Sequence, residues 1–439
     1  MTTQAMRTRP RVSGAAEALD DYLAQRGTER LRPPLRYLRR KPGRGLVAVF
    51  GPGAVGDIYT VTVDEQALLA GPDAATLSGS TVQEFPVDPK LSQLDVVMSP
   101  SGHRALTEAL ESTARRMHAV PPERPLLGIA AEPVRYKPGD RCVLRYRLDF
   151  GDPGAGPGTC TLIAKLYREP GEAQAADDLL SRLRGQAGLA WTARALGVVP
   201  GLPLALTEDL GSSRDPVPAH SGLHVVHPGS ADAVEVVRRA ARALAELHTS
   251  GLDSGDLSTR TGADEAVKAA RRARLIEQYV PDLAPMVRQV ADTLCAGLTG
   301  LPTDTLRSAH GSYKPSQLMV REGAVFLVDF DQFCLADPAL DVGYFLAYLR
   351  PAGLWYRRAG RRAWFEAAAD AFRTSYLHRL AERGESTDTC AGIARRAPVF
   401  EGALLLKIAA RRANRLHSPR PGEVAAMLDE VADSLVRAG

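Results

Sequence analysis

The chain has 439 residues, enough for two or three domains with a buried core, and its 45% hydrophobic and 24% charged content is ordinary for a soluble globular protein. A formal net charge of +4 gives no argument for a nucleic-acid partner, and five cysteines without CxxC spacing predict neither a disulfide framework nor a zinc site. The first residues lack the apolar segment of a secretory signal and no uncharged apolar run is long enough for a membrane span, so we expect a cytoplasmic protein with no membrane association.

Residues 1–125 are predicted to form a small α+β extension, with helices over 15–26 and 102–120. Residues 30–44 carry seven Arg or Lys and no acid, which indicates either a solvated surface or a docking site for an acidic peptide or a phosphate group. The segment KPGRGLVAVF (41–50) predicts a Pro-Gly turn followed by a strand. Its pattern recurs as KPGDRCVLRY at 137–146, as either a duplicated hairpin or a second use of a favourable turn.

Strands separated by one helix are predicted between residues 126 and 213. Strands are expected over 127–136 and 142–150, joined by a turn at 137–140, and again over 161–167. Lys165 stands in the apolar frame of the third strand, where a lysine costs stability unless it is paired, points into a cleft or reaches water from an edge strand. A helix is expected over 170–184, and the apolar strand 202–213 ends in Thr-Glu-Asp-Leu-Gly.

Helices dominate the rest of the predicted structure. Apolar residues at helical spacing predict a helix over 232–249. Further helices are expected over 265–279, 282–298, 363–379, 400–415 and 422–438.

The segment 308–349, SAHGSYKPSQLMVREGAVFLVDFDQFCLADPALDVGYFLAYL, carries the strongest functional pattern. Two β-branched runs, Leu318–Val320 and Val325–Phe330, flank a turn and predict a hairpin. The hairpin brings the polar residues before its first strand beside those at the end of its second, so Gln317 and Asp329 can face one cation. Mg²⁺ takes one or two carboxylate or amide oxygens and completes its shell with phosphate and water, as in phosphoryl-transfer sites.

The order of HGxxxxxQ, a hydrophobic hairpin ending in DFD, and DPALDVGYFLAYL resembles the C-terminal lobe of the aminoglycoside phosphotransferase-like family, a branch of the protein-kinase-like fold. The resemblance extends over about 126–439 and implies an α+β, bilobal fold. Residues 126–211 would form the small lobe with its hinge, 212–439 the large helical lobe, and 1–125 an N-terminal extension.

The resemblance implies a nucleotide site for ATP in the small lobe. The hairpin turn with Lys137 and Gly139 would lie over the phosphates, and Lys165 would bind the α- and β-phosphates. The acid that pairs with this lysine stays open among Glu172, Asp177 and Asp178.

The same resemblance implies a hinge that reads the adenine edge through main-chain groups at Glu208, Asp209 and Leu210. Any strand that ends in a loop would look similar, and only the placement between Lys165 and His310 favours a hinge.

The catalytic loop departs from the family pattern at one position. By the resemblance, Gln317 and Asp329 bind Mg²⁺, whereas His310 and Asp341 hold the loop in shape. Asp341 would bind loop backbone, and Asp337 would cap the helix that begins at 339. Ser312 stands where the family carries its catalytic Asp.

Asp331 could replace the missing catalytic carboxylate, and Lys314 gives an indication of the acceptor. A serine hydroxyl needs a base of its own, and Asp331 could take that role if the DFD segment is extended. Lys314 matches the lysine of the HRDLKPSN loop of Ser/Thr protein kinases, which contacts the γ-phosphate and points to a peptide hydroxyl; otherwise it is a surface lysine.

Three functions fit these observations. The first is an ATP- and Mg²⁺-dependent phosphotransferase whose acceptor hydroxyl belongs to a peptide Ser/Thr, as in lanthipeptide-type bacterial pathways, or to a small-molecule alcohol such as an antibiotic or sugar. The second is a pseudokinase that binds nucleotide or a partner enzyme as a scaffold, favoured by Ser312 and the single glycine of the hairpin turn. The third is transfer of a nucleotidyl group from ATP.

Overall fold

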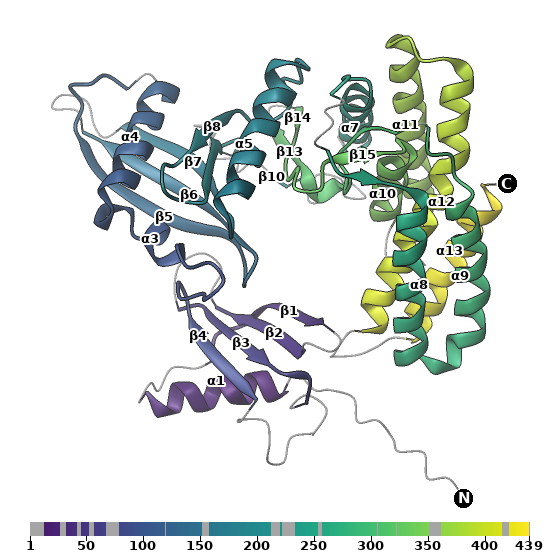
Figure 1. The fold of residues 1–439 in the computed structure, drawn as a ribbon, viewed down its shortest axis with the longest axis horizontal. Helices are drawn as coiled ribbons and strands as arrows, with labels where there is room; N and C mark the ends of the chain where they lie inside the picture. The colour runs from purple at the N-terminus through teal and green to yellow at the C-terminus, as the bar shows by residue number, and fades with distance from the viewer. Residues whose placement is uncertain are drawn as a thin grey trace, which may run out of the picture. The chain divides into compact units, whose positions relative to one another are not determined.

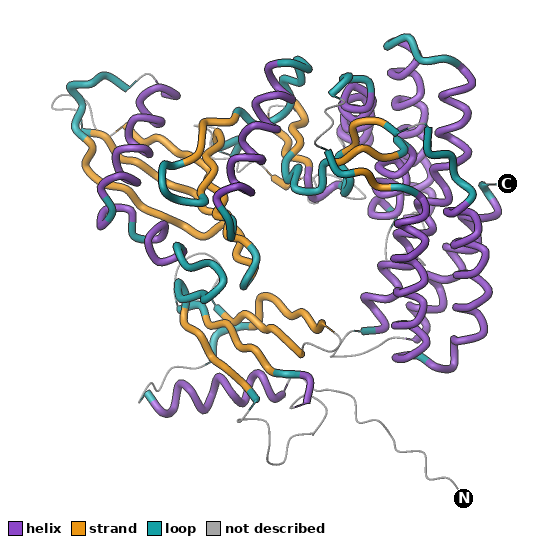
Figure 2. The backbone as a smooth tube through the Cα atoms, in the orientation of Figure 1, coloured by secondary structure: helices purple, strands orange, loops and turns teal. Residues whose placement is uncertain are grey.

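The computed structural model describes residues 13–26, 32–41, 45–51, 57–66, 79–118, 120–151, 158–211, 220–221, 233–252, 257–304, 306–321, 323–350, 361–414 and 421–438. The chain divides into two compact units. The first is built from Met1–Asp178 and Ala195–Asp209, and the second from Leu179–Arg194, Leu210–Asn414 and Pro419–Gly439. The β-rich elements gather in the first unit and long helices in the second (Figure 1, Figure 2).

An antiparallel sheet and one helix form the N-terminal part of the first unit. The strands β1 (Leu35–Lys41), β2 (Gly45–Phe50), β3 (Tyr59–Val63) and β4 (Ser80–Glu84) pair in sequence order, and α1 (Ser13–Gln25) lies along them (Figure 1). The helix contributes Leu19 to a core that also contains Leu46 and Val61, all fully buried. This small core confirms the predicted α+β character of the extension.

A second antiparallel sheet completes the first unit, with strand order β5-β6-β7-β9-β8. Its strands are β5 (Leu126–Lys137), β6 (Arg141–Phe150), β7 (Gly158–Leu166), β8 (Ala195–Val198) and β9 (Leu204–Glu208). Strand β6 buries every second side chain, as a strand with one covered face should. Leu106 and Leu110 of α4 (Arg104–His118) belong to this core, as do Leu94 and Val97 of α3 (Leu94–Met98).

Helices α3 and α4, and the short 3₁₀ helix Pro100–Gly102 between them, therefore pack with the second sheet although they precede residue 126. The boundary that we predicted at residue 125 stays a prediction. Helix α5 (Pro170–Gly185) follows β7 as expected, and the division between the two units falls inside it.

The second unit is mainly helical. Its long helices are α7 (Ala233–His248), α8 (Gly262–Tyr279), α9 (Ala284–Thr299), α10 (Ala339–Leu349), α11 (Arg361–Glu382), α12 (Thr387–Ala413) and α13 (Pro421–Val436). Two small sheets accompany them, with orders β10-β13-β14 and β11-β15-β12. Their strands are β10 (His220–Ser221), β11 (Thr259–Arg260), β12 (Arg307–Ala309), β13 (Leu318–Arg321), β14 (Ala324–Leu327) and β15 (Cys334–Ala336), and two 3₁₀ turns span Pro281–Leu283 and Pro315–Gln317.

The α+β fold class is thus confirmed. The strand expected over 202–213 is shorter, since β9 covers Leu204–Glu208, and two further predicted boundaries are wrong. The strand expected over Val325–Phe330 ends at Leu327, because the backbone turns to a φ of +69° at Asp329. The helix expected from residue 400 begins at Thr387 and runs through Pro398. The two KPG segments do share a geometry: both belong to antiparallel hairpins, in which Lys41 pairs with Gly45 and Lys137 with Arg141.

The described part of the basic segment 30–44 is mostly strand β1, and three of its arginines make contacts within the first unit. Arg32 pairs with Asp20 at 2.6 Å, Arg40 pairs with Glu65 at 2.6 Å, and Arg36 donates to the carbonyl of Gly51. Arg32 and Arg36 remain exposed, as on the solvated surface that we considered, and a docking role for this segment stays a prediction.

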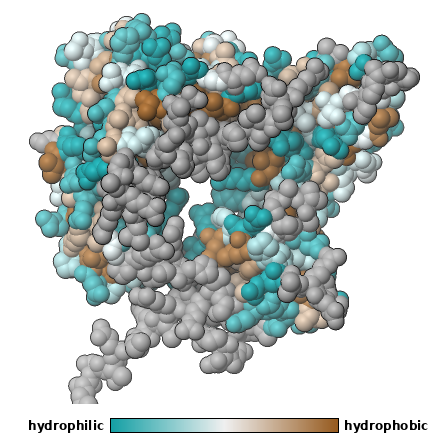
Figure 3. Space-filling model, turned by 180° about the vertical axis from the view of Figure 1, so that it is seen from behind, coloured by the Kyte–Doolittle hydropathy of each residue, from teal (hydrophilic) through white to brown (hydrophobic). Residues whose placement is uncertain are grey.

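Surface polarity agrees with the composition. Apolar side chains lie in scattered patches among hydrophilic ones on the face shown in Figure 3. The large exposed apolar side chains of the described residues include Leu127 and Val134 on β5, Val87 and Val267. Among the helices that the structure describes, none is both long and apolar enough to cross a membrane.

Helices α10 and α12 approach closely at Gly343, and this contact gives a stability prediction. A Cβ at Gly343 would lie 2.5 Å from the amide nitrogen of Glu401 and 2.7 Å from the carbonyl oxygen of Ala397. Gly343→Ala should therefore destabilise the protein by roughly 1–3 kcal/mol in urea unfolding, although alanine is the better helix former.

Gly171→Ala in α5 is the matched control. A Cβ there would meet nothing within 4 Å, so its unfolding free energy should stay within about 0.5 kcal/mol of the wild type or rise. Equal behaviour of the two variants would contradict close packing at Gly343.

Candidate active site

The loop between β12 and β13 contains a glycine, Gly311, at a position where a side chain would clash with backbone. Gly311 has a φ of +72°, and a Cβ there would lie 2.0 Å from the carbonyl oxygen of Gln332. The close approach explains why histidine is followed by glycine in this motif. It also holds the loop against the turn that follows Asp329.

One buried carboxylate fixes the conformation of this loop. Asp341, in the first turn of α10, accepts the backbone N–H of His310 at 2.6 Å and that of Gly311 at 3.3 Å through Oδ2, and that of Tyr313 at 3.4 Å through Oδ1. The fully buried ring of His248 lies 3.4 Å from Oδ2. Burial raises the pKa of Asp341, but the hydrogen bond and charge of His248 outweigh it, so its pKa lies below the ordinary value. The predicted bond from Asp341 to loop backbone is confirmed.

His310 is a neutral structural group. Its Nε2 donates to the carbonyl of Val328 at 3.2 Å, which leaves Nδ1 as the unprotonated nitrogen. Burial lowers the pKa of His310 below its ordinary value despite the charges of Asp341 and Asp329. The ring packs on Phe330 with centroids 4.7 Å apart. His310 therefore ties the loop to the segment after β14 and is not placed to carry a proton to substrate.

The hairpin places the predicted metal ligands together. Leu318 pairs with Leu327, and the N–H of Val328 donates to the carbonyl of Gln317, so Asp329 lies just beyond the paired strands. The Gln317 amide nitrogen lies 3.4 Å from Asp329 Oδ2.

The oxygens of this pair suit a hard cation. The Oε1 of Gln317 is buried without a hydrogen-bond partner, and rotation of the amide by 180° would turn that oxygen toward Asp329. A carboxylate and an amide oxygen are the ligand types that Mg²⁺ accepts. Among the residues that the structure describes, no group of three or more His, Cys, Asp or Glu could hold a metal, so the protein would supply few ligands.

Ser312 and the metal pair form one polar group. The Gln317 amide nitrogen donates to Ser312 Oγ at 2.9 Å. Asp331 follows in a turn with Gln332, so our premise of an extended DFD segment is wrong and its role as a base stays untested. The ammonium of Lys314 lies 5.6 Å from the ring centre of Tyr348 on α10, so this lysine is held against the helix.

In the first unit, Lys165 lies on β7 with its ammonium 5.3 Å from the ring centre of Tyr167. The carboxylates considered as its partner make other contacts. Glu172 accepts the N–H groups of Arg168 and Glu169, Asp177 accepts the N–H of Gly197 at 2.9 Å, and Asp178 accepts from Gln174. The partner of Lys165 thus stays a prediction.

The hairpin turn expected over the phosphates is held by a carboxylate that the sequence did not point to. Asp88 Oδ2 accepts the N–H of Gly139 at 2.7 Å and the hydroxyl of Tyr136 at 2.8 Å. Lys137 pairs with Asp140. The N–H that we assigned to phosphate is therefore taken by Asp88, and phosphate binding there would require an exchange. The Pro-flanked position of Asp88 gives no signal of this contact.

The predicted hinge coincides with the division between the compact units, which falls between Asp209 and Leu210. The side chain of Asp209 is buried and accepts from Arg145 Nε at 2.8 Å. Strand β9 ends one residue earlier, at Glu208.

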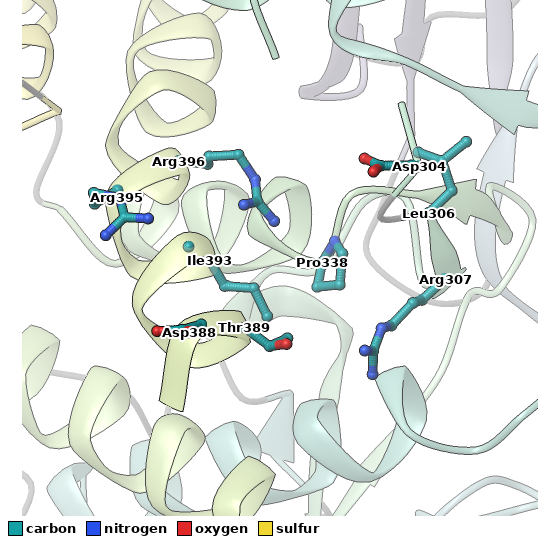
Figure 4. A pocket seen from close by; sticks show the side chains of 10 residues that line it. Asp304, Leu306, Arg307, Pro338, Asp388, Thr389, Ile393, Arg395 and Arg396 are labelled. Atoms are coloured by element: carbon teal, nitrogen blue, oxygen red, sulfur yellow. The ribbon is translucent and has the colours of Figure 1, made fainter. Parts of the chain in front are cut away.

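A cavity of about 380 Å³ lies elsewhere in the second unit, between the segment before β12 and the first turns of α12 (Figure 4). Two of its arginines are already paired, Arg307 with Glu385 and Arg396 with Asp337. None of the predicted site residues lines it.

Comparison with known proteins identifies the family. The model of the phosphotransferase enzyme family matches residues 144–385, more than half of the chain. The protein belongs to this family. The family is one of phosphotransferases, and the resemblance to aminoglycoside phosphotransferase-like proteins is confirmed. The comparison with curated proteins gives no match.

Solved structures with a similar fold include three kinases or presumed kinases. A putative aminoglycoside phosphotransferase from Ralstonia eutropha JMP134 has 18% identity and a TM-score of 0.48 over 76% of this chain and 98% of its own. Glucosamine kinase in complex with glucosamine, ADP and inorganic phosphate has 16% identity and a TM-score of 0.48, and the match covers 98% of this chain and 99% of its own. Amicoumacin kinase hAmiN in complex with AMP-PNP and Ca²⁺ has 15% identity and a TM-score of 0.45, and the match covers 76% of this chain and 96% of its own. These likenesses are too distant to assign a substrate.

Asp341→Asn tests the anchoring of the loop. Because an amide nitrogen cannot accept the loop N–H groups, the variant should lose about 2–4 kcal/mol of unfolding free energy at pH 7. The folded pKa of Asp341 lies below its unfolded value, so its contribution is present above about pH 4 and is lost as pH falls through the folded pKa. The difference in unfolding free energy between the wild type and Asp341→Asn, measured by urea unfolding, should therefore become smaller below pH 4.

Asp292→Asn, an exposed position on α9, is the control and should show no such difference. A difference for Asp341→Asn that stays constant down to pH 3 would contradict an ionised Asp341.

Proposed function

We propose that this protein transfers the γ-phosphoryl group of ATP to the hydroxyl of a small molecule, with Mg²⁺ held by Gln317 and Asp329. The observation that carries the proposal is the group formed by Ser312, Gln317 and Asp329, within hydrogen-bond reach of one another on a loop fixed by Asp341. The family supplies the reaction type, and this geometry supplies residues of the kind that reaction needs.

Bound Mg²⁺ would neutralise charge on the β- and γ-phosphates. Asp329 supplies a carboxylate oxygen and Gln317 an amide oxygen, and the positive φ at Asp329 directs its side chain out of the strand toward Gln317. On the nucleotide, Lys165 would bind the α- and β-phosphates and main-chain groups of Glu208 to Leu210 would read the adenine edge.

Ser312 would position the acceptor hydroxyl by a hydrogen bond instead of taking its proton. Phosphoryl transfer proceeds through a loose transition state in which positioning and charge stabilisation supply most of the catalysis. A general base contributes about 10²–10⁴-fold. The chain would therefore be a slow but active enzyme, with Lys314 near the transferred phosphoryl group and Asp331 as the carboxylate that could assist.

A small molecule is the acceptor class that the related kinases favour, since glucosamine and amicoumacin are small molecules. A peptide Ser/Thr acceptor had rested on Lys314 and on the basic segment 30–44, part of which is internally paired. A nucleotide- or partner-binding pseudokinase is the second candidate, because Ser312 replaces the carboxylate and Asp88 holds the N–H of Gly139.

Substitutions at Asp329 and Ser312 test the reaction. With radiolabelled ATP, Mg²⁺ and a panel of small alcohols, Asp329→Asn should lower turnover at least about 100-fold, because it removes the charged metal ligand. Ser312→Ala should cost less than about tenfold, and Ser312→Asp should raise the rate by supplying a base.

Each variant would be checked for an unchanged melting temperature. Binding of Mg²⁺ and ATP without transfer, in the wild type and in Ser312→Asp alike, would instead support a pseudokinase.

Asp88→Asn tests whether the turn at Gly139 reads phosphate. Asp88 accepts hydrogen bonds through both oxygens, and an amide has one acceptor oxygen, so the variant loosens the N–H of Gly139 and removes a negative charge. ATP binding should tighten by about tenfold in calorimetry, while the lost contacts lower the melting temperature. Asp95→Asn, exposed on α3, is the control and should change neither. Weaker ATP binding in Asp88→Asn would show that the Asp88 contact supports the turn for nucleotide.

A further inference from the structure

Two tyrosines one turn apart on α10 contact a row of basic side chains that leads from the catalytic loop. We call this row the basic strip; its members are Lys314, Arg411, Lys407, Arg260, Arg272 and Lys268. The ring of Tyr344 lies under the ammonium of Lys407 at 5.2 Å, and its hydroxyl accepts from Arg260 at 2.6 Å. The ring of Tyr348 lies under Lys314 at 5.6 Å, and its hydroxyl accepts from Arg411 at 3.1 Å. Each tyrosine thus positions one lysine and one arginine.

The strip is joined to the loop that carries Ser312. Arg260, on β11, donates to the carbonyl oxygen of Gly311, the residue before Ser312. Lys314 belongs to the loop itself. The strip is also continuous with α8 and α12, which pack against each other within the second unit (Figure 1).

Cations outnumber carboxylates in this strip. Glu265 is the buried acid, and it pairs with Arg260 at 2.7 Å and Lys268 at 2.7 Å and lies 4.0 Å from Arg272. These three cations share one carboxylate, so they leave an excess of positive charge before Lys407 and Arg411 are counted.

Lys407 is the least compensated member. In the described residues, no hydrogen bond or ion pair joins Lys407 to a carboxylate. Burial, and then the charges of Arg411, Arg272 and Arg260, lower its pKa to about 7. A partly buried ammonium beside arginines costs stability unless something negative completes the site.

Other buried arginines of the same unit are matched by acids. Arg350 pairs with Glu401 and Glu430, and Arg412 pairs with Glu423. The excess of positive charge near Lys407 is therefore local, because these other buried arginines of the unit are paired with carboxylates.

We propose that Lys407, Arg411 and Arg272 form a binding site for a negatively charged group, a carboxylate or a phosphate, on the acceptor molecule. The proposal rests on the proposed function, since it names the class of acceptor for that reaction. An anion on this strip would place a hydroxyl of the same molecule toward Ser312, because the strip continues through Tyr348 and Lys314 to the loop. A cationic acceptor, such as an amino sugar, would be repelled.

The first experiment measures anion binding without ATP. Melting temperatures of the full chain would be recorded with sodium phosphate, sodium acetate and glucosamine at equal ionic strength. Phosphate, acetate or both should raise the melting temperature. A response to phosphate indicates a phosphate group on the acceptor, and a response to acetate indicates a carboxylate. Lys407→Met should melt higher than the wild type, because a buried charge is removed, and should lose the response to the anion.

A variant on the same helix serves as the control. Arg395→Met changes an exposed arginine in the first half of α12, outside the strip, and should keep the full anion response. A lower melting temperature for Lys407→Met, or an anion response equal to that of the wild type, would overturn the site.

The second experiment measures transfer from radiolabelled ATP to four molecules of similar carbon skeleton: glucose, glucosamine, gluconate and glucose 6-phosphate. The anionic acceptors should be phosphorylated in preference, and Lys407→Met should raise their KM at least about tenfold with a smaller change in kcat. Preference for glucosamine or glucose would overturn the inference while the phosphotransferase reaction stands. If none is phosphorylated, the Lys407-dependent anion response alone decides the site, and the reaction is judged by the Asp329 variant.

Discussion

The carboxylate of Asp341 is the interaction on which the rest of the site depends. It accepts three consecutive or nearly consecutive backbone N–H groups, and no side-chain contact elsewhere in the described residues constrains as much of this loop. The loop in turn sets the positions of Ser312 and Gln317, and through Gln317 that of Asp329. The carboxylate belongs to α10, the helix that packs closely on α12 at Gly343, so the residue that anchors the loop lies on a helix held in the helical core.

Contacts that follow from one hairpin could be predicted from the sequence. The pairing of two short strands brings Gln317 beside Asp329, and a motif of fixed spacing relates His310 to Asp341. The contacts that were missed join segments with no common pattern. Asp88 reaches Gly139 across 51 positions, and Arg260 reaches Gly311 across 51 positions, so neither periodicity nor turn chemistry signals them. The strand at Val328 was overextended because its residue types suit a strand, whereas the turn at Asp329 is imposed by the tertiary site.

Electrostatic matching separates the structural from the functional parts of the helical unit. Where arginines join helices to one another they meet carboxylates, as Arg350 does with Glu401 and Glu430. Around the tyrosines of α10, Arg260 shares Glu265 with two other cations, whereas Arg411 meets the hydroxyl of Tyr348 and Lys407 the aromatic face of Tyr344. A hydroxyl and an aromatic face orient Arg411 and Lys407 without neutralising them, which is what a binding surface for an anion requires.

The path of the chain between the two compact units has a consequence for how the protein can be divided. Leu179–Arg194 belongs to the helical unit although the chain returns to the β-rich unit for Ala195–Asp209. Trp191 is held within the helical unit by Glu246 and by the N–H of Leu327. A single cut between Asp209 and Leu210 would therefore leave the helical unit without Leu179–Arg194, which would stay with the other fragment. Because a segment of the helical unit lies within the sequence of the β-rich unit, the two units cannot be separated by one cut or exchanged as independent modules.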